Sequence, residues 1–199
     1  MYVNAKSMQE RLPPLIDEEL TDAQRAAAQA VANGPRGSAR GPFAVMLRSP
    51  EFMDRTQRLG EFLRFNCSVP IALREFVILI CASEWRQSYE WAIHAPLAES
   101  AGVSAQIIGD LARQRTPTDL DADQDTVYRF CNELTEYHAV SDPTYARAVE
   151  LLGEAGVVEL CGICGYYSML AMVMNVARTE PPGGGLEPPF PLPETPDAN

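Results

Sequence analysis

The sequence lacks any cluster of basic residues. Its 16 lysine and arginine residues face 27 aspartate and glutamate residues, which gives a formal net charge of -11 and a pI near 4.6. Nucleic-acid phosphates and anionic lipid headgroups both require a basic protein face. We therefore expect neither a nucleic-acid partner nor a membrane surface.

Several motifs that mark common enzyme classes are also missing. There are two histidines, His94 and His138, and no HExxH or paired CxxC spacing, so too few ligands are available for a metal site. A G-x-S-x-G elbow is absent, which argues against a serine triad. No glycine-rich loop follows a strand, so nucleotide phosphates have no evident cradle. We expect no metal and no cofactor.

The N-terminus and the cysteines indicate the cellular compartment. The first 20 residues, MYVNAKSMQERLPPLIDEEL, contain no apolar stretch flanked by basic residues and a cleavage site. An odd number of cysteines in apolar surroundings is typical of reduced thiols rather than of a secreted disulfide framework. These are Cys67, Cys81, Cys131, Cys161 and Cys164. We expect a cytoplasmic protein.

Apolar periodicity predicts an all-α chain with one domain, residues 1–180, whose residues 1–65 form an N-terminal helical arm. The Pro/Gly-rich residues 181–199 predict an extended or disordered tail. A helix starting at Ser49 or Pro50 is expected to turn its large apolar side chains inward; these are Phe52, Leu59, Phe62 and Leu63. Further helices are predicted over 22–33, 43–47, 71–85, 88–102, 105–113, 124–139, 143–153 and 155–178.

The last predicted helix is apolar on almost every side. Its length would suit a membrane span, but Glu159, Asn175 and the lack of basic flanks argue against one. A helix that is apolar all round is otherwise buried all round. A domain of this size can rarely surround such a helix alone, so we expect a homo-oligomer.

The segment SYEWAIHAPLAESAGV, residues 88–103, contains a candidate acid–base pair. Glu90 and His94 are four residues apart and share one helix face. A carboxylate beside an imidazole can fix its tautomer and raise its basicity. Tyr89 and Trp91 could wall the site, and Ser88 is placed to cap the helix. The alternative is a surface ion pair or a hydrogen-bonded core histidine.

Cys161 and Cys164 form a second candidate site. Redox CxxC pairs usually lie at a helix N-terminus, where the dipole stabilises the thiolate. This pair lies inside a long apolar helix, where burial raises thiol pKa values. Core packing is the alternative to redox activity.

The motif LREFVILICASEWRQSYEWAIHAPLAESAGVS, residues 73–104, resembles the core motif of the carboxymuconolactone decarboxylase family, which includes the AhpD-like alkylhydroperoxidases. RLPPL, NGPRG, GPFAVMLRSPE, LRFNCSVP and VVELCGICGYYSMLAMVMNVARTEPPGG resemble a long-chain subgroup of that family. The resemblance implies an AhpD-like multi-helix bundle that oligomerises through apolar helices, as a dimer, trimer or hexamer.

The same resemblance assigns roles to individual positions. The glutamate and histidine of the peroxidase branch fall on Glu75 and His94, but its two cysteine positions fall on Gln87 and Glu90. Thiol chemistry cannot run there without sulfur. The decarboxylase branch matches Glu90 and His94 instead, although its remaining pattern differs.

The resulting hypothesis is an enzyme that uses Glu75, Glu90 and His94 on a small carboxylated or lactone-type molecule. His94 would carry the proton, Glu90 would orient it, and repulsion between the carboxylates would raise one pKa. A thiol-dependent hydroperoxide reductase and a non-catalytic oligomeric binding protein are the alternatives. Three side chains could bind a substrate carboxylate: Arg74, Arg64 and Arg36.

Overall fold

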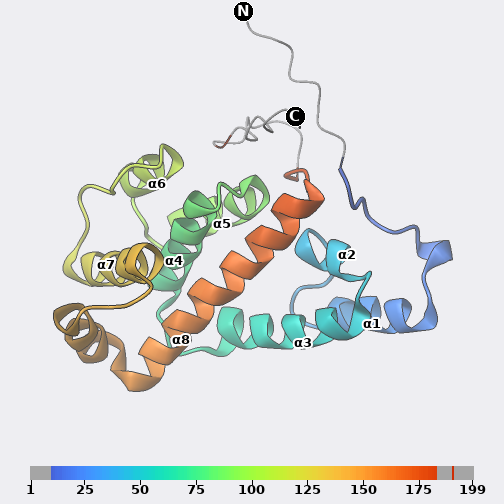
Figure 1. The fold of residues 1–199 in the computed structure, drawn as a ribbon, viewed down its shortest axis with the longest axis horizontal. Helices are drawn as coiled ribbons and strands as arrows, with labels where there is room; N and C mark the ends of the chain where they lie inside the picture. Colours follow the sequence, from blue (N-terminus) through green and yellow to red (C-terminus); the bar gives the residue numbers. More distant parts are fainter. Residues whose placement is uncertain (1–9, 183–189, 191–199) are drawn as a thin grey trace, which may run out of the picture.

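The chain is all α-helical, as predicted. A computed structural model describes residues 10–182 and residue 190, which contain eight α-helices and no β-strand (Figure 1). A 3-10 turn, η1 (Asp17–Glu19), precedes the first helix, and a π-helical turn, η2 (Phe62–Asn66), follows the third. The α-helices are α1 (Asp22–Asn33), α2 (Pro42–Met46), α3 (Pro50–Glu61), α4 (Ile71–Glu84), α5 (Ser88–Ser100), α6 (Ala105–Ala112), α7 (Ala122–Tyr137) and α8 (Asp142–Ala177).

Local sequence signals set several of the helix boundaries. The Thr21 and Asp121 side chains accept hydrogen bonds from the backbone N–H groups of Gln24 and Gln124, which completes a capping box at the start of α1 and of α7. After α5, Gly102 has a φ of 101°, a left-handed conformation that favours glycine. The helix boundaries at Thr21, Asp121 and Gly102 follow from this chemistry.

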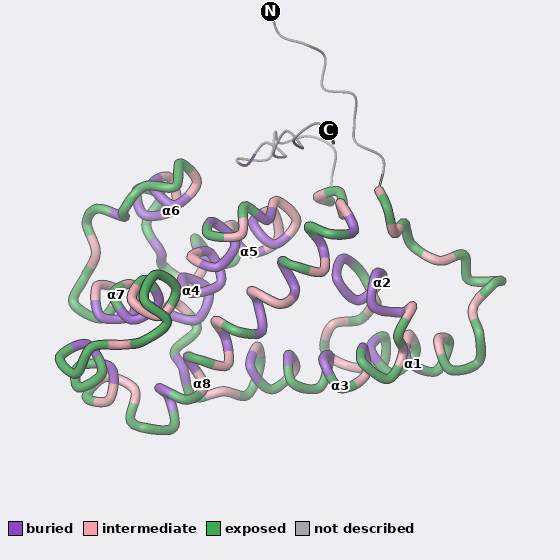
Figure 2. Tube along the Cα trace, viewed as in Figure 1, coloured by how far each residue is buried: buried purple, intermediate pink, exposed green. Residues whose placement is uncertain are grey.

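The core forms around α4 and α8. Four consecutive α4 residues, Phe76 to Leu79, are completely buried because α5, α7 and α8 all pack against this helix. Figure 2 shows buried residues concentrated along α4 and on one side of α8. Burial of apolar area on this scale is the main stabilising contribution to such a fold.

The long helix α8 contains an interruption. Gly153 has φ 70° and ψ 169°, which is not helical, so two helical segments meet there. The predicted break between residues 153 and 155 corresponds to this position.

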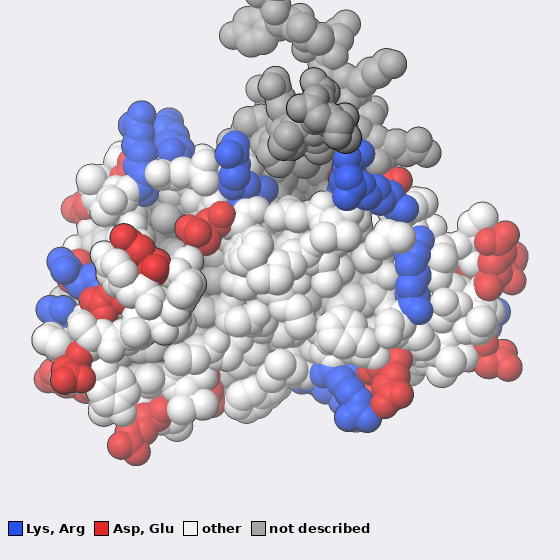
Figure 3. All heavy atoms as spheres, viewed as in Figure 1, with Lys and Arg blue, Asp and Glu red and all other residues white. Residues whose placement is uncertain are grey.

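One face of α8 remains uncovered in the single chain. The helix is long and apolar enough to cross a membrane by length and composition, yet 44% of its most apolar 18-residue stretch is buried inside the fold. Val158, Met172 and Val176 are exposed. Figure 3 shows a broad area without charged side chains where α8 crosses the same view. An uncovered apolar face is compatible with the expected homo-oligomer, which stays a prediction.

The predicted orientation of α3 is wrong. Phe52, Leu59 and Phe62 are each more than 40% exposed, and only Leu63 of the predicted inward set is buried. The face of α3 that packs on the core is the one that contains Gly60. A Cβ atom at Gly60 would collide with the Tyr166 side chain. The absence of a side chain at Gly60 therefore permits α3 to pack closely against α8.

The start of α5 also differs from the prediction. Gln87, not Ser88, is the N-cap residue, and its side-chain oxygen accepts a hydrogen bond from the Tyr89 N–H. The Ser88 hydroxyl instead donates to the Phe190 carbonyl at 3.3 Å. Most of the predicted tail, residues 183–189 and 191–199, lies outside the described residues.

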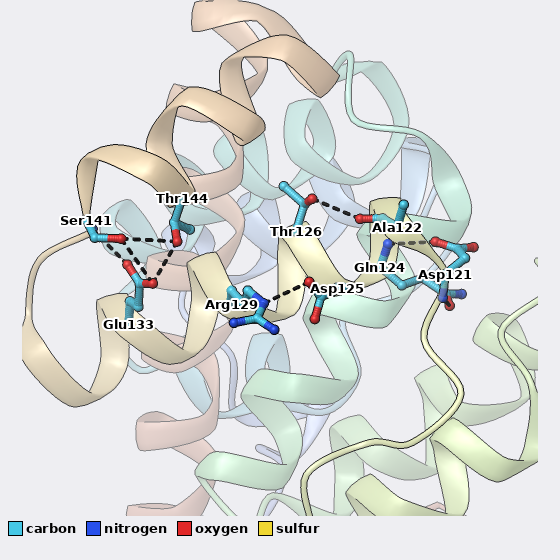
Figure 4. Close-up of polar contacts among 9 residues, drawn as sticks. All are labelled: Asp121, Ala122, Gln124, Asp125, Thr126, Arg129, Glu133, Ser141 and Thr144. Carbon is cyan, nitrogen blue, oxygen red and sulfur yellow. Dashed lines mark hydrogen bonds and ion pairs between the residues drawn. The ribbon is translucent and has the colours of Figure 1, made fainter.

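The connection between α7 and α8 is held by one carboxylate. Glu133 accepts hydrogen bonds from the Ser141 N–H at 2.7 Å and from the Thr144 hydroxyl at 2.7 Å (Figure 4). An ion pair between Arg129 and Asp125 lies on the exposed side of α7. The contacts of Glu133 join the end of α7 to the beginning of α8.

Replacing Gly60 tests the packing of α3. We expect Gly60→Ala to lower the free energy of unfolding by about 1–3 kcal/mol, because the added methyl group displaces Tyr166. Gly165→Ala is the matched control on α8: its Cβ would meet no atom within 4 Å. That change should stabilise the protein by about 0.5–1 kcal/mol. Urea denaturation measures both, and equal effects would contradict the packing of α3.

Candidate active site

A cavity of about 300 Å³ lies where α2, α5, α8, η2 and the loop before α2 meet. The lining combines three arginines, one carboxyl group and one imidazole with aromatic and aliphatic side chains. The residues around it are Arg36, Gly37, Ser38, Arg40, Pro42, Phe43, Arg64, Tyr89, Glu90, Ile93, His94, Tyr167 and Leu170. An apolar pocket with a few convergent polar groups is the usual form of a small-molecule site.

His94 and Glu75 form a buried pair across α5 and α4. The His94 Nδ1 atom lies 2.7 Å from Glu75 Oε2, and both residues are 4% exposed. Burial lowers the pKa of His94, although Glu75 acts in the opposite direction. A neutral imidazole donates its Nδ1–H to the carboxylate and keeps a lone pair on Nε2. His94 is therefore prepared to accept a proton.

Glu90 has a different role from the one predicted. It is 3% exposed, and neither carboxyl oxygen has a hydrogen-bond partner within the described residues. The expectation that Glu90 orients His94 is wrong, because Glu75 reaches the ring from α4. Burial, not repulsion between carboxylates, raises the pKa of Glu90 well above its ordinary value. Burial thus favours the protonated form of this carboxyl group beside the cavity.

Two segments before α4 supply the positive charge. Arg36 and Arg40 come from the loop before α2, and Arg64 comes from η2. The Arg36 guanidinium lies 4.6 Å from the centroid of the Phe43 ring, which fixes its position. π-Helical turns occur often at functional sites, and here the turn places Arg64 at the cavity.

Arg74 does not belong to this set. Its Nη1 atom lies 3.6 Å from the Cys67 sulfur, and the side chain does not line the cavity. The prediction for Arg74 as a carboxylate-binding residue is wrong, because the residue faces Cys67 near the start of α4. Arg36 and Arg64 do lie where the prediction needs them.

The walls of the cavity are aromatic. Tyr89 packs closely against Gly41, whose φ of 54° and missing Cβ leave room for the ring. Tyr167 from α8 packs edge-on against His94 with ring centroids 5.3 Å apart. Trp91 faces away from the cavity and packs against Phe190, so its predicted role as a wall is wrong.

Gln87 supports the site from outside. Its side-chain amide donates to the Asn175 side chain at 2.9 Å, and Asn175 donates to the Trp85 carbonyl at 2.8 Å. Gln87 therefore ties the turn between α4 and α5 to α8. It does not line the cavity.

Sequence reasoning missed Arg40, Phe43 and Tyr167. Arg40 lies in the segment GPRGSARGPF, which places two arginines in one glycine-rich loop. Two arginines in one glycine-rich loop, followed by an aromatic residue, could have indicated Arg40 and Phe43 as residues of a binding site. Nothing in the apolar last helix distinguishes Tyr167 from a core residue, because only the packing of α8 against α5 brings it to His94.

The cysteines of α8 do not act as a simple pair. Cys161 is exposed and Cys164 is half-buried. The closest sulfur contact of Cys164 is with Cys131 of α7, at 3.6 Å. Within the part of the chain that the structure describes, no group of three or more His, Cys, Asp or Glu residues is arranged to hold a metal ion.

The fold is shared with a solved structure. An uncharacterized peroxidase-related protein from Silicibacter sp. TM1040 superimposes with a TM-score of 0.65 and 15% sequence identity, over 86% of this chain and 90% of that chain. No protein-family model and no curated protein matches the sequence. The likeness confirms the all-α bundle. The cytoplasmic location stays a prediction.

The burial of Glu90 predicts how stability varies with pH. A carboxyl group whose pKa is raised by folding stabilises the protein fully below its unfolded value, near 4.5, and this stabilisation is lost as the pH rises through the folded value. We therefore expect Glu90→Gln to gain stability relative to wild type as the pH rises. The slopes should differ by up to about 1.4 kcal/mol per pH unit.

Denaturant unfolding at several pH values measures this difference. Glu99→Gln is the control, because it removes an exposed carboxyl group from the same helix. Parallel pH profiles for wild type and Glu90→Gln would contradict the burial of an unpaired carboxyl group.

Proposed function

We propose that the protein is an acid–base enzyme that acts on a small carboxylated or lactone-type molecule, as a carboxymuconolactone decarboxylase-like lyase or an isomerase. The observation that carries this proposal is the unpartnered Glu90 carboxyl group, which lines the same cavity as His94 and three arginines. A buried polar group without a partner costs free energy. A bound substrate would supply the missing hydrogen bond.

The arginines favour an anionic substrate. Arg36, Arg40 and Arg64 give the cavity three positive charges, while burial raises the pKa of Glu90 and so favours its uncharged form. Guanidinium groups bind carboxylates with directed pairs of hydrogen bonds. Among the described residues, the buried Nε atom of Arg36 has no hydrogen-bond partner, so this donor is unused in the free protein.

Two reactions fit these groups. In isomerisation, Nε2 of His94 removes a proton from one carbon, and Glu90 donates a proton to another. In decarboxylation, the bond to the carboxylate carbon breaks, CO₂ leaves, and the remaining carbon gains the proton of Glu90. In both reactions His94 restores the proton of Glu90: in isomerisation it passes on the proton it removed, and in decarboxylation it relays one from solvent. Glu75 holds the His94 ring in position in both reactions.

Replacing His94 tests this function. With a panel of small carboxylated γ-lactones, we expect His94→Gln to lower kcat about 10²–10⁴-fold, the usual contribution of a general acid or base. His138→Asn is the matched control, since it changes an exposed histidine whose φ of 57° asparagine accepts. Ultraviolet absorbance follows the lactone.

Full turnover by the His94→Gln variant would refute the acid–base function. A compound that binds in the cavity and is released unchanged by wild type would instead favour the non-catalytic binding protein.

A thiol-dependent hydroperoxide reductase is the second candidate. The observation that favours it is the 3.6 Å contact between the Cys164 and Cys131 sulfurs, which lowers the pKa of Cys164. A thiolate is the nucleophile that such chemistry requires. The name of the Silicibacter protein, peroxidase-related, is compatible with this candidate.

Under this candidate, wild type consumes an organic hydroperoxide with dithiothreitol as reductant, and a Cys161→Ser, Cys164→Ser double variant does not. Loss of the hydroperoxide, followed by its oxidation of ferrous ion in the presence of xylenol orange, measures the turnover. Absence of turnover in wild type would remove the candidate, and the His94→Gln variant should leave any peroxide turnover unchanged.

A further inference from the structure

A second cavity lies on another part of the molecule, between α4, α7 and α8. Its volume is also about 300 Å³. It is lined by three cysteines and by a set of polar side chains: Ile80, Cys81, Glu84, Cys131, Asn132, Thr135, Glu136, Cys164 and Ser168. No residue of this cavity lines the cavity at His94.

Three sulfurs converge on the inner end of this cavity. Cys131 Sγ lies 3.6 Å from Cys164 Sγ, and Cys81 Sγ lies 3.8 Å from the Cys164 carbonyl oxygen. Cys81 and Cys131 are buried, whereas Cys164 is half-buried. The cavity therefore gives a small reagent a route to a thiol that has a second thiol beside it.

The geometry selects Cys131, rather than Cys161, as the partner of Cys164. Cys161 and Cys164 are three residues apart on a continuous helix, where Cβ atoms are about 5–6 Å apart. A disulfide requires about 3.5–4.5 Å between Cβ atoms, so this pair could close only if the helix were distorted. Cys131 belongs to a different helix and its sulfur already touches that of Cys164.

The environment also makes Cys164 the reactive member of the pair. Hydrogen bonds from the Cys131 and Cys81 thiols lower the pKa of Cys164, and the hydrogen bond to Cys164 raises the pKa of Cys131. In such a pair the thiolate attacks a disulfide, and the neighbouring thiol then displaces the rest of the reagent from the mixed disulfide.

The rim of the cavity carries negative charge. Glu84 and Glu136 are exposed, and they are the charged side chains among the described residues that line it. Carboxylates repel an anionic reagent and attract a cationic one as it approaches. The rim should therefore discriminate between reagents by charge.

We propose that Cys131 and Cys164 form a dithiol site, which small neutral or cationic disulfides entering this cavity oxidise to a disulfide bond between α7 and α8. The proposal shares Cys164 with the second candidate function but requires no peroxide turnover, and it uses no residue of the first cavity.

The reaction has two exchange steps. The Cys164 thiolate attacks one sulfur of the reagent R–S–S–R, a mixed disulfide forms, and one R–S⁻ leaves and takes a proton. Cys131 then loses its proton and attacks the Cys164 sulfur, and the second R–S⁻ leaves with that proton. The protein loses two hydrogen atoms, that is two protons and two electrons, and the reagent gains them as two R–SH molecules.

The test uses two disulfides of similar size and opposite charge, cystamine and 3,3′-dithiodipropionate. The protein is the Cys161→Ser variant, which removes the exposed thiol. After incubation at neutral pH, free thiols are alkylated with N-ethylmaleimide, and mass spectrometry of the intact chain and of its peptides locates the bonds.

We expect cystamine to produce a chain that has lost two hydrogen atoms, with the peptides of Cys131 and Cys164 linked. The dianionic disulfide should react about tenfold more slowly. In a Glu84→Gln, Glu136→Gln double variant this difference should shrink. With Cys131→Ser, the reaction should stop at one cysteamine adduct on Cys164, and Cys131→Ala serves if the serine variant does not fold.

Two results would overturn the proposal. One is the absence of a Cys131–Cys164 link after treatment with cystamine, which the Cys161→Ser protein reveals without any change in the core. The other is an equal rate with both disulfides, which would show that the carboxylate rim does not select the reagent.

Discussion

The structure depends on α4, a helix that is almost entirely enclosed by its neighbours. Because α5, α7 and α8 all pack on it, α4 supports both cavities: its Glu75 holds His94, which lines the first, and its Cys81 lines the second. The hydrogen bond between Glu75 and His94 fixes α5 against α4 where water cannot compete for either group. The two sites are therefore separate in their lining residues but share one rigid support.

Burial changes the pKa values of the buried side chains in different directions. It raises the pKa of Glu90 and lowers that of His94, which favours a proton donor and a proton acceptor in the same cavity. At Cys164 hydrogen bonds from neighbouring thiols outweigh burial, and the charged form is favoured. The deciding factor is a polar neighbour: Glu90 has no hydrogen-bond partner among the described residues, whereas Cys164 Sγ lies 3.6 Å from Cys131 Sγ.

Local patterns in the sequence predict the helices well, because periodicity, caps and glycines act over a few residues. They predict the site only in part. Glu90 lies near His94 in sequence, yet the ring is oriented by Glu75, 19 residues away, since tertiary packing decides which carboxylate reaches Nδ1. The error at Phe52 has a similar origin: periodicity identifies an apolar face but not whether the core or another surface covers it. Tyr167 could not be predicted, because its place depends on how α8 crosses α5.

The contact between Trp91 and Phe190 gives the far end of the chain a physical link to the helix that bears His94. The rings meet edge to face with centroids 5.3 Å apart, on the side of α5 that faces away from the cavity. An indole changes its emission when its surroundings become wet, and Trp91 is one of two tryptophans in the chain. The fluorescence of this residue therefore serves as a built-in optical signal for whether residue 190 is seated behind the proposed catalytic helix.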